Sequence, residues 1–492
     1  MPQPRRAWSL ARGSARLSIE VIPTTDVPLT RTLPNGLVLH ALEARHAPVV
    51  SLWVWYHVGG RDEVPGTTGM SHFLEHMLFK GTSRHPKGVL DRLFARWGAS
   101  FNAFTSEDVT CYLETVPKER YATALEHEAD RMRNALVDPA EVDAERNVIV
   151  SEREGLENDP DFLLGETLQA VAFDRHPYGQ GVIGSKDEIK LMTREGLYAH
   201  YRRHYLPNNA FVVVVGDDDP ERLLDQAALA FGPVEAGEPV APPRAPEPPQ
   251  MGEKRLVVRR AGGALPIVQI AFRAPRATDP LAPALSAASA ALGGGGGDSA
   301  SGRSSRLYRA LVESGLAVNT GASFQLMKDP HLFMMDATLK PGVAHAEVER
   351  ALLTEASKLA SDVLEEREFA KVKRQLLAGS AYASDSVTGR AFRTGHLLAT
   401  GAAGSVSEWH AKLQAVTAVE IRDAARTIFV ERSRVVGHFI PEDGRVSHGY
   451  AGASELEAEG REPLGERRED ADGPVSGATD GANDSHATGV TR

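Results

Sequence analysis

Apolar residues along the chain follow strand patterns and helix patterns in alternation. Residues 49–58 are rich in β-branched and aromatic side chains and predict a long strand, which ends at two glycines. In residues 70–78 the apolar side chains recur with the three- and four-residue spacing of one helix face, and neither Pro nor Gly interrupts residues 71–80. We expect a helix with Ser71 as its N-cap and with Gly81 just beyond its end.

The same two patterns predict the other elements of the first half. Pro34, Asn35 and Gly36 separate two apolar runs and indicate a hairpin turn. Asp138 and Pro139 are typical of the start of a helix. Further strands are predicted at residues 108–116 and 210–217, and further helices at residues 88–97, 118–136, 162–173, 194–204 and 220–231.

The second half of the chain partly repeats this order of elements. A weak internal repeat of this kind predicts an α+β fold built from two homologous α/β-sandwich halves of about two hundred residues each. The matching segments are residues 264–272 with 47–55, residues 324–339 with 101–116, and residues 434–439 with the strand that begins near Phe211.

Composition marks the boundaries between these parts. Prolines recur every few residues from 235 onwards and indicate a linker. After residue 445 the chain turns to Gly, Glu, Asp, Ser and Thr, which is typical of disorder. We therefore expect an N-terminal extension at 1–26, a first half at 27–234, a Pro-rich linker at 235–252, a second half at 253–445 and a disordered tail at 446–492.

The helix predicted near residue 71 carries the strongest chemical pattern. His72 and His76 are four residues apart and share one face, with Glu75 on the adjoining edge. Two neutral imidazoles at this spacing can bind one Zn²⁺, and a carboxylate beside them can accept a proton from water. Two such histidines alone are more often packed or solvated side chains, but the order His-x-x-Glu-His is that of the inverzincins and requires a third ligand.

Two carboxylates on the helix that follows Asp138 are candidates for that third ligand. Glu145 and Glu152 are seven residues apart and lie on one helix face beside apolar positions. A glutamate on a solvated face is ordinary, whereas one on a buried face is costly unless it is paired or bound to a metal. Glu152 and Glu145 are therefore the expected third ligand and its neighbour. The corresponding helix of the second half, at 283–292, has no histidine, so only the first half can hold the metal.

Composition excludes several other classes of function. The formal net charge is −11, and no stripe of Lys and Arg with interleaved aromatics occurs, so we expect no nucleic-acid partner. No apolar run approaches the roughly 18 residues that cross a bilayer. The single cysteine, Cys111, lies in a strand pattern and is expected to be a small core residue. It permits no disulfide within the chain, which is typical of a reducing compartment.

The N-terminal residues bear on the location of the protein. Residues 1–19 contain four arginines and no acidic residue, a pattern faintly similar to an organellar transit peptide. No apolar segment of a secretory signal follows these arginines. We expect a disordered extension and a cytoplasmic protein, with the transit peptide as the alternative.

Taken together, these motifs resemble those of the pitrilysin-type (M16) zinc peptidases. The resemblance rests on His72 to His76 with Glu145 and Glu152, on the segment 102–105, on the loop 176–179, and on the duplicated half. The layout is similar to that of the mitochondrial processing peptidase β subunit and its short bacterial relatives. The resemblance implies two halves that face each other, one Zn²⁺ on His72, His76 and Glu152, Glu75 as general base, and Glu145 as a carboxylate that steadies the site.

The resemblance also implies a binding mode for the substrate. The segment Asn102, Ala103, Phe104 and Thr105 is similar to the edge strand to which a peptide or an unfolded protein adds as a further strand in this family. The expected activity is that of a zinc-dependent endopeptidase acting on such chains.

The second half departs from the family pattern. Val312 and Val318 stand where the resemblance implies an Arg and a Tyr that contact the substrate. The implied partner is therefore a homologous subunit that supplies this pair, in a heterodimer or a homodimer. A non-catalytic structural or peptide-binding subunit is the alternative. The loop from Gly293 to Gly297 is longer than the family pattern and is expected to be flexible or to gate the substrate. No Gly-Lys-Ser/Thr follows it, so a phosphate-binding loop is excluded.

Overall fold

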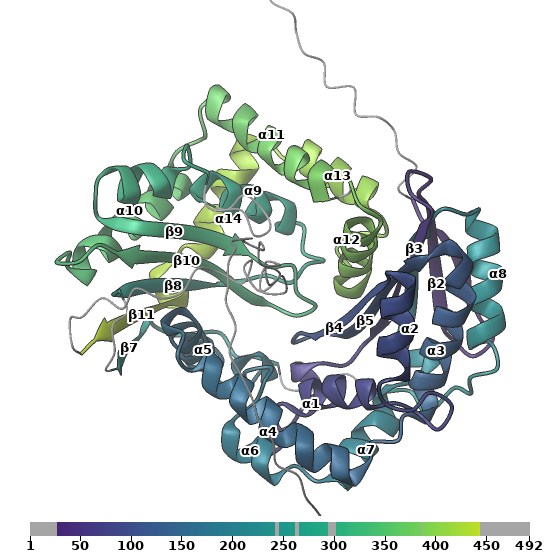
Figure 1. The fold of residues 1–492 in the computed structure, drawn as a ribbon. Coiled ribbons are helices and arrows are strands. Elements are labelled where there is room, and N and C mark those ends of the chain that lie inside the picture. Colours follow the sequence, from purple (N-terminus) through teal and green to yellow (C-terminus); the bar gives the residue numbers. More distant parts are fainter. Residues whose placement is uncertain (1–26, 242–245, 261–264, 294–301, 384, 443–492) are drawn as a thin grey trace, which may run out of the picture. The chain divides into compact units, whose positions relative to one another are not determined.

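The structure is a computed structural model that describes residues 27–241, 246–260, 265–293, 302–383 and 385–442 (Figure 1). The predicted N-terminal extension at 1–26, the predicted tail at 446–492 and most of the glycine loop after Gly293 lie outside the described residues. All described residues belong to one compact unit, Met1–Val446.

The first half builds a six-stranded mixed sheet in the order β1-β2-β6-β3-β5-β4. Strands β2 and β6 run parallel, and the other neighbours run antiparallel. The predicted hairpin joins β1 to β2 and places Thr32 opposite Val38, and Gly36 supplies the φ of 87° that its turn requires. The strands are β1 (Leu29–Thr32), β2 (Val38–Glu43), β3 (Val49–Tyr56), β4 (Ser100–Thr105), β5 (Thr110–Pro117) and β6 (Ala210–Gly216).

The second half builds a five-stranded sheet in the order β7-β11-β8-β10-β9. Strand for strand this order repeats β2-β6-β3-β5-β4, and the parallel pair β7 and β11 repeats the pair β2 and β6. The topology therefore confirms the predicted duplication. The strands are β7 (Lys254–Arg260), β8 (Ile267–Ala274), β9 (Ala317–Phe324), β10 (His331–Leu339) and β11 (Arg434–Pro441).

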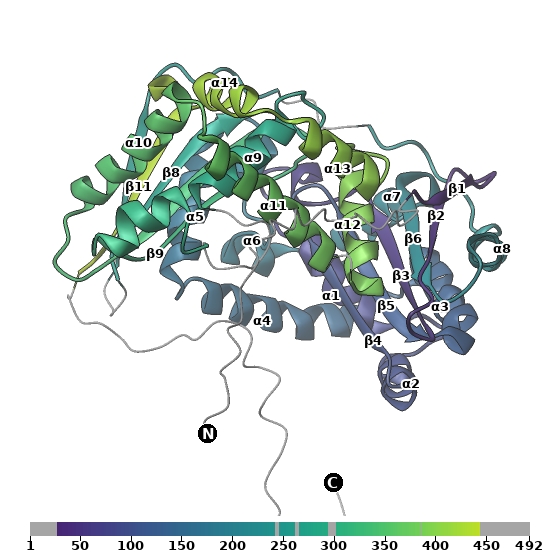
Figure 2. The same cartoon turned by 90° about the horizontal axis from the view of Figure 1, so that it is seen from above.

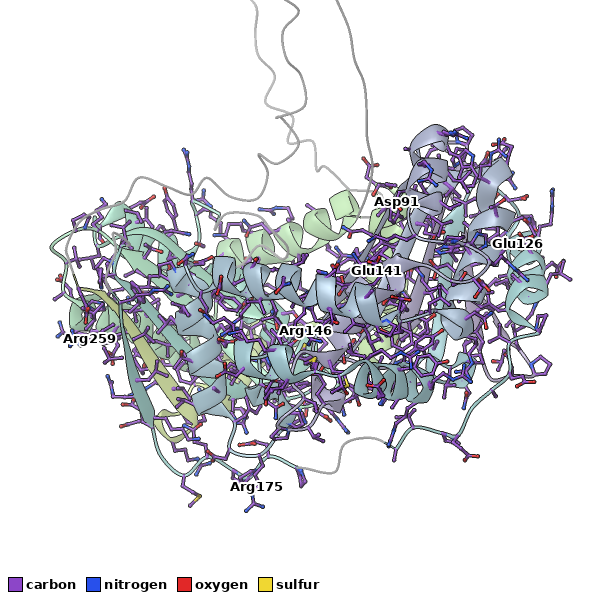
Figure 3. All side chains as sticks on the ribbon, turned by 60° about the horizontal axis from the view of Figure 1, so that its bottom comes forward. Asp91, Glu126, Glu141, Arg146, Arg175 and Arg259 are labelled. Carbon is purple, nitrogen blue, oxygen red and sulfur yellow. The ribbon has the colours of Figure 1, made fainter. Side chains whose placement is uncertain are left out.

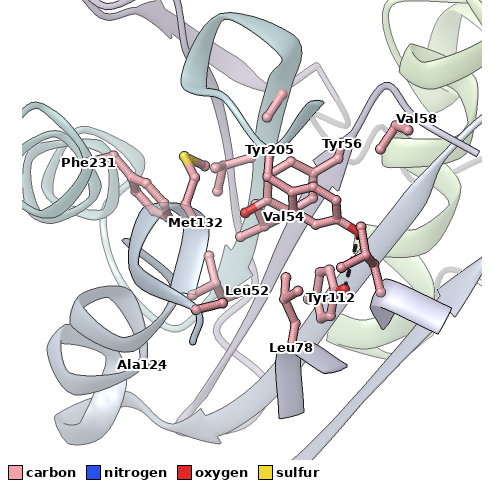
Figure 4. Close-up of a cluster of buried hydrophobic side chains, with 14 of the residues drawn as sticks. Leu52, Val54, Tyr56, Val58, Leu78, Tyr112, Ala124, Met132, Tyr205 and Phe231 are labelled. Atoms are coloured by element: carbon pink, nitrogen blue, oxygen red, sulfur yellow. Dashed lines mark hydrogen bonds between the residues drawn. The ribbon is translucent and has the colours of Figure 1, made fainter. Parts of the chain in front are cut away.

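Helices of each half cover one face of its own sheet. In the first half Tyr56, Tyr112 and Tyr205 lie at the centre of the buried cluster, and the hydroxyls of Tyr112 and Tyr205 are 3.4 Å apart (Figure 4). The helices of the first half are α1 (Met70–Met77), α2 (Val89–Trp97), α3 (Tyr121–Asn134), α4 (Pro139–Leu156), α5 (Pro160–Ala172), α6 (Lys186–Leu191), α7 (Arg194–His204) and α8 (Pro220–Phe231). Those of the second half are α9 (Ala282–Leu292), α10 (His345–Ser361), α11 (Glu366–Ala383), α12 (Val387–Thr400), α13 (Val406–Ala415) and α14 (Ala418–Ile428).

The opposite face of each sheet is covered by a helix of the other half (Figures 1 and 2). Helix α12 packs on β3 and β6, and a Cβ atom at Gly395 would lie 2.3 Å from the Trp55 ring, so only glycine permits this approach. Helix α5 packs on β8 and β11. There the Leu164 side chain lies over Gly437, and a Cβ atom added at Gly437 would lie 3.0 Å from it. The two halves thus bury apolar surface in each other.

A buried polar network joins the halves at the loop that begins at His176. The Arg61 guanidinium contacts Asp108 at 3.1 Å and Asp329 of the second half at 2.7 Å. The Tyr178 hydroxyl donates to Asp108 at 2.5 Å, and Nε2 of His176 lies 3.1 Å from Asp329. Because these charged and polar groups of the two halves bind one another, the loop is a structural joint between the halves.

The second part of the predicted linker is anchored rather than free. The Glu247 carboxylate accepts hydrogen bonds from the amides of Asp174, Arg175 and His176 at 2.8–2.9 Å. Arg273 of β8 pairs with the same carboxylate at 3.0 Å. One glutamate therefore ties the linker to both halves.

Candidate metal centre

Helix α1 carries the His-x-x-Glu-His motif, and its N-terminus is built differently from the prediction. Ser71 is not the N-cap: it lies inside the helix, and Gly69, with a φ of 88°, occupies the cap position. The amides of Gly69 and Ser71 donate to the two oxygens of the buried Glu63 carboxylate at 2.7 and 2.6 Å. An acidic side chain from the preceding loop thus accepts the hydrogen bonds of the first amides of the helix, in place of the predicted serine cap. The helix ends in a 3₁₀ turn, Leu78–Lys80, before Gly81.

The three residues predicted as metal ligands lie together. Their ligand atoms all fall within 4.8 Å of one another. Nε2 of His72 is 3.7 Å from Oε1 of Glu152, and Nε2 of His76 is 3.6 Å from Oε2 of Glu152. These distances exceed hydrogen-bond lengths, so the three groups converge without bonding one another.

This spacing fits a zinc ion. Ligand atoms that lie about 2.1 Å from a tetrahedral Zn²⁺ are roughly 3.4 Å from one another, close to both measured separations. Burial, and then the neighbouring His76, lowers the pKa of His72 to about 4, so its imidazole is neutral and can donate a lone pair at neutral pH. The Glu152 side chain is 43% exposed, which leaves one side of the group open.

Glu145 lies beside the ligands, where the resemblance implied it. Its Oε1 atom is 2.8 Å from Nδ1 of His76, and its Oε2 atom is 2.5 Å from Nζ of Lys80. Burial opposes ionisation of Glu145, but the bonds from Lys80 and His76 outweigh it, so the pKa of Glu145 lies below its usual value. Lys80 was missed from the sequence, although its place four residues after His76 puts it on the same side of the helix.

Helix α4 is fixed at its N-terminus and along its length. The helix predicted to begin at Asp138 and Pro139 is confirmed, and the Asp138 carboxylate caps it by accepting from the amides of Ala140 and Glu141. Arg146 donates to the carbonyls of Ile189 and Met192 at 2.8 Å, and its guanidinium lies 5.7 Å from the centre of the Phe73 ring on α1. Figure 3 shows Arg146 and Glu141 on this helix. These contacts hold α4, and with it Glu152, against α1.

Glu75 lies on the inner side of α1, next to the ligands in sequence. Its Oε2 atom accepts a hydrogen bond from the Thr105 hydroxyl at 2.6 Å. Burial raises the pKa of the Glu75 carboxyl above its usual value, and the bond from Thr105 partly opposes this rise. A carboxylate with a raised pKa, held in one orientation, is suited to accept a proton from water.

The segment predicted to bind substrate is confirmed as an edge strand. Among the strands that the structure describes, β4 pairs with β5 alone and is the last strand of its sheet. Asn102 is exposed, and its Oδ1 atom accepts from the Ala103 amide at 2.9 Å. Thr105 belongs to this strand as predicted. Its side chain also contacts Glu75, which the sequence did not predict.

The two departures from the family pattern occupy different environments. Val312 lies in a short π-helical segment, Tyr308–Glu313, and packs against the core of the second half. Val318 lies in the edge strand β9 and is 46% exposed. An exposed strand position can accept a larger side chain, whereas a packed helical position cannot do so without repacking.

A second group of possible metal ligands lies between β5 and α3. Glu114, His127 and Glu128 are fully buried and also lie within 4.8 Å of one another. The guanidinium of Arg131 pairs with Glu128 and lies 4.0 Å from Glu114. Because the Arg131 guanidinium already pairs with the carboxylates of this group, the group is a poor site for a divalent metal.

Comparison with known proteins agrees with this geometry. Residues 39–186 match the family described as insulinase (peptidase family M16), and residues 192–376 match the family described as the peptidase M16 inactive domain. An uncharacterised zinc protease of Mycobacterium tuberculosis is 30% identical over 82% of this chain and 91% of its own length. The chain belongs to peptidase family M16.

Two further relatives of this M16 chain extend the comparison. A probable mitochondrial-processing peptidase subunit beta of Arabidopsis thaliana is 28% identical over 85% of this chain and 79% of its own length. The crystal structure of a protease from Helicobacter pylori superposes with a TM-score of 0.80 at 26% identity, over 84% of this chain and 99% of that chain. The two-domain M16 fold is therefore shown for nearly the whole described chain. Within the described ranges, no helix is long and apolar enough to cross a membrane.

Proposed function

We propose that this M16 chain is a zinc-dependent endopeptidase that hydrolyses peptides or unfolded polypeptides. The single observation that carries the proposal is the convergence of His72, His76 and Glu152 beside Glu75. A Zn²⁺ bound there supplies Lewis-acid activation of a water molecule and of the peptide carbonyl. M16 relatives named zinc proteases support the choice of metal.

The residues around the metal have separable tasks in this proposal. Glu75 accepts a proton from the attacking water while the water oxygen bonds to the carbonyl carbon of the peptide. Glu75 then delivers this proton to the peptide nitrogen as the bond between that nitrogen and the carbonyl carbon breaks. Thr105 holds the Glu75 carboxylate at 2.6 Å, and Glu145 holds the His76 ring. Strand β4 offers its free edge to the backbone of the peptide.

The test is cleavage of a quenched fluorescent peptide by the full chain with one equivalent of Zn²⁺. Glu75→Gln keeps the size of the side chain and removes the base, so we expect at least a thousandfold loss of kcat with bound zinc unchanged. Glu154→Gln, on the exposed side of α4, is the matched control and should retain activity. Equal activity of the Glu75→Gln protein and the wild type would contradict the proposal.

The departures at Val312 and Val318 support a second part of the proposal, a homologous partner subunit. The chain then lacks its own donors for the substrate carbonyl, and a partner with Arg and Tyr restores them. We expect slow cleavage by the chain alone and at least a hundredfold rise in kcat/KM with such a subunit. Rapid cleavage by the chain alone would remove the need for a partner and keep the peptidase.

The same departures favour one alternative function, a non-catalytic subunit that binds peptides. Under this alternative, Glu75→Gln lowers neither the activity of the chain alone nor the activity of its mixture with a homologous subunit. Measurement of that variant in the mixture therefore separates the two functions.

A further inference from the structure

An exposed aromatic side chain of the second half lies beside the edge strand of the first half. Phe392 of α12 is 43% exposed. Its ring centre is 6.1 Å from that of Phe104 on β4, in an edge-to-face arrangement, and 5.9 Å from that of Trp53 on β3. Single exposed apolar residues are ordinary on protein surfaces. Phe392 differs because it extends a buried aromatic cluster toward Phe104 of the edge strand β4.

Helix α12 is held firmly at this point. Gly395, one turn after Phe392, lies against the Trp55 ring, and any larger residue there would clash with it. His396 stacks on Phe392 with an angle of 19° between the rings. The position of the exposed ring is therefore set by packing on both sides.

The side chains of β4 alternate between two faces of the sheet. Thr105 points to Glu75, and the Phe101 ring lies 5.0 Å from the Phe94 ring of α2, so both face the metal side. Phe104 points to the opposite face, where its ring lies 5.5 Å from that of Trp55. A peptide that pairs with β4 must alternate in the same way, because directly opposed residues share a face.

The backbone of β4 is free to pair at its outer edge. The Ala103 amide donates to the side-chain oxygen of the exposed Asn102 at 2.9 Å, which places this amide on the outer side of the strand. In an antiparallel strand the polar groups of alternate residues point to the same side, so Phe101 and Thr105 also present theirs outward. Hydrogen bonds to these backbone groups determine which residue of an added strand lies opposite Phe104 and near Phe392.

We propose that Phe104 and Phe392 form a binding site for one large apolar or aromatic side chain of the substrate, on the face of β4 opposite the metal ligands. This inference rests on the proposed function and narrows its substrate class. The peptide residue opposite Phe104 packs on the Phe104 ring, and a large side chain there extends over this ring toward the exposed Phe392, while its two neighbours point to the metal side. The second half thus selects substrate for a site that the first half contains.

The test uses alanine-rich quenched peptides in which one Phe is moved through successive positions. We expect wild type to prefer one position, and we expect Phe392→Ala to lower kcat/KM for that peptide about tenfold more than for the all-alanine peptide. Leu229→Ala, a change at a 79% exposed position on α8, is the control and should leave every ratio unchanged. An equal effect of Phe392→Ala on all peptides, or no effect, would overturn the proposal.

A binding measurement separates this proposal from the proposed hydrolysis. The Glu75→Gln protein is titrated with the same labelled peptides, and fluorescence anisotropy gives Kd without cleavage. We expect the preferred peptide to bind about tenfold tighter than the all-alanine peptide, and we expect Phe392→Ala in this background to abolish the difference. If wild type cleaves nothing but the binding preference is present, the hydrolysis fails and the side-chain site stands. If peptides are cleaved but binding shows no such preference, the side-chain site fails alone.

Discussion

Nδ1 of His76 lies 2.8 Å from Oε1 of Glu145. A carboxylate in this position accepts a hydrogen bond from the Nδ1–H group, so the lone pair lies on Nε2, which faces Glu152. Lys80 contacts the other oxygen of Glu145 at 2.5 Å and keeps this carboxylate ionised. The pair therefore selects the tautomer of His76 that a metal requires.

Removing the charge of Glu145 should weaken metal binding without removing a ligand. We expect Glu145→Gln to lower zinc affinity about 10- to 100-fold, because the amide no longer fixes the tautomer and orientation of His76. Competition with a chelating dye measures this affinity. Glu141→Gln, which removes only a surface pair with Lys87, should bind zinc as the wild type does. Equal affinities of the two variants would show that Glu145 does not act on His76.

The Glu63 side chain, which caps α1 from the preceding loop, should contribute to the free energy of unfolding. Glu63→Ala leaves the amides of Gly69 and Ser71 without acceptors, and we expect the free energy of unfolding to fall by about 1–3 kcal/mol. Urea denaturation followed by circular dichroism measures the change. Glu119→Ala, at an exposed position before α3, is the control with no expected effect. A loss of less than a few tenths of a kcal/mol for Glu63→Ala would contradict the capping role.

Removing the hydroxyl of Thr105 should change the pH dependence of cleavage. Its hydrogen bond favours the ionised form of Glu75, so Thr105→Val should raise the pKa of that carboxyl. We expect the acid limb of kcat/KM to move to higher pH and kcat at its optimum to fall about tenfold. Thr105→Ser keeps the hydroxyl and should keep the profile. A Thr105→Val profile that coincides with that of the wild type would rule out this role.

Buried histidines should make the fold sensitive to acid. His331 is 5% exposed, and among the described residues neither of its ring nitrogens has a hydrogen-bond partner. Burial lowers its pKa from 6.5 to about 4. The unfolded chain therefore binds more protons than the folded chain between these values, and stability falls as the pH drops from 6.5 toward 4.

His331→Leu removes this one contribution to the acid sensitivity. We expect the slope of unfolding free energy against pH, measured between pH 5 and 6, to decrease by up to about 1.4 kcal/mol per pH unit. Urea midpoints at several pH values measure the slope. An unchanged slope would mean that His331 is not a neutral buried group.

Local patterns predicted much of the fold and of the candidate site. Apolar spacing placed α7 and α8 at their observed bounds, and the helical positions of His72 and His76 required no tertiary information. The cap of α1 could not be predicted, since Ser71 fits a local cap and the actual acceptor, Glu63, reaches the helix only through the folded loop.

Contacts between the halves were beyond the reach of the sequence patterns. The amphipathic pattern of α12 does not say which sheet it covers, and only the space beside Gly395 shows that Trp55 of the other half lies there. Lys80 likewise gains its role from Glu145 on a separate helix. The boundaries proposed for the extension, halves, linker and tail stay predictions.

The central claim is that His72, His76 and Glu152 hold one Zn²⁺ while the rival group at Glu114, His127 and Glu128 holds none. Crystals of the full chain grown with zinc, measured above and below the zinc absorption edge, test it directly. We predict one anomalous peak per chain, between Nε2 of His72, Nε2 of His76 and the Glu152 carboxylate. A peak at the buried Glu114 group, or no peak beside α1, would contradict the account.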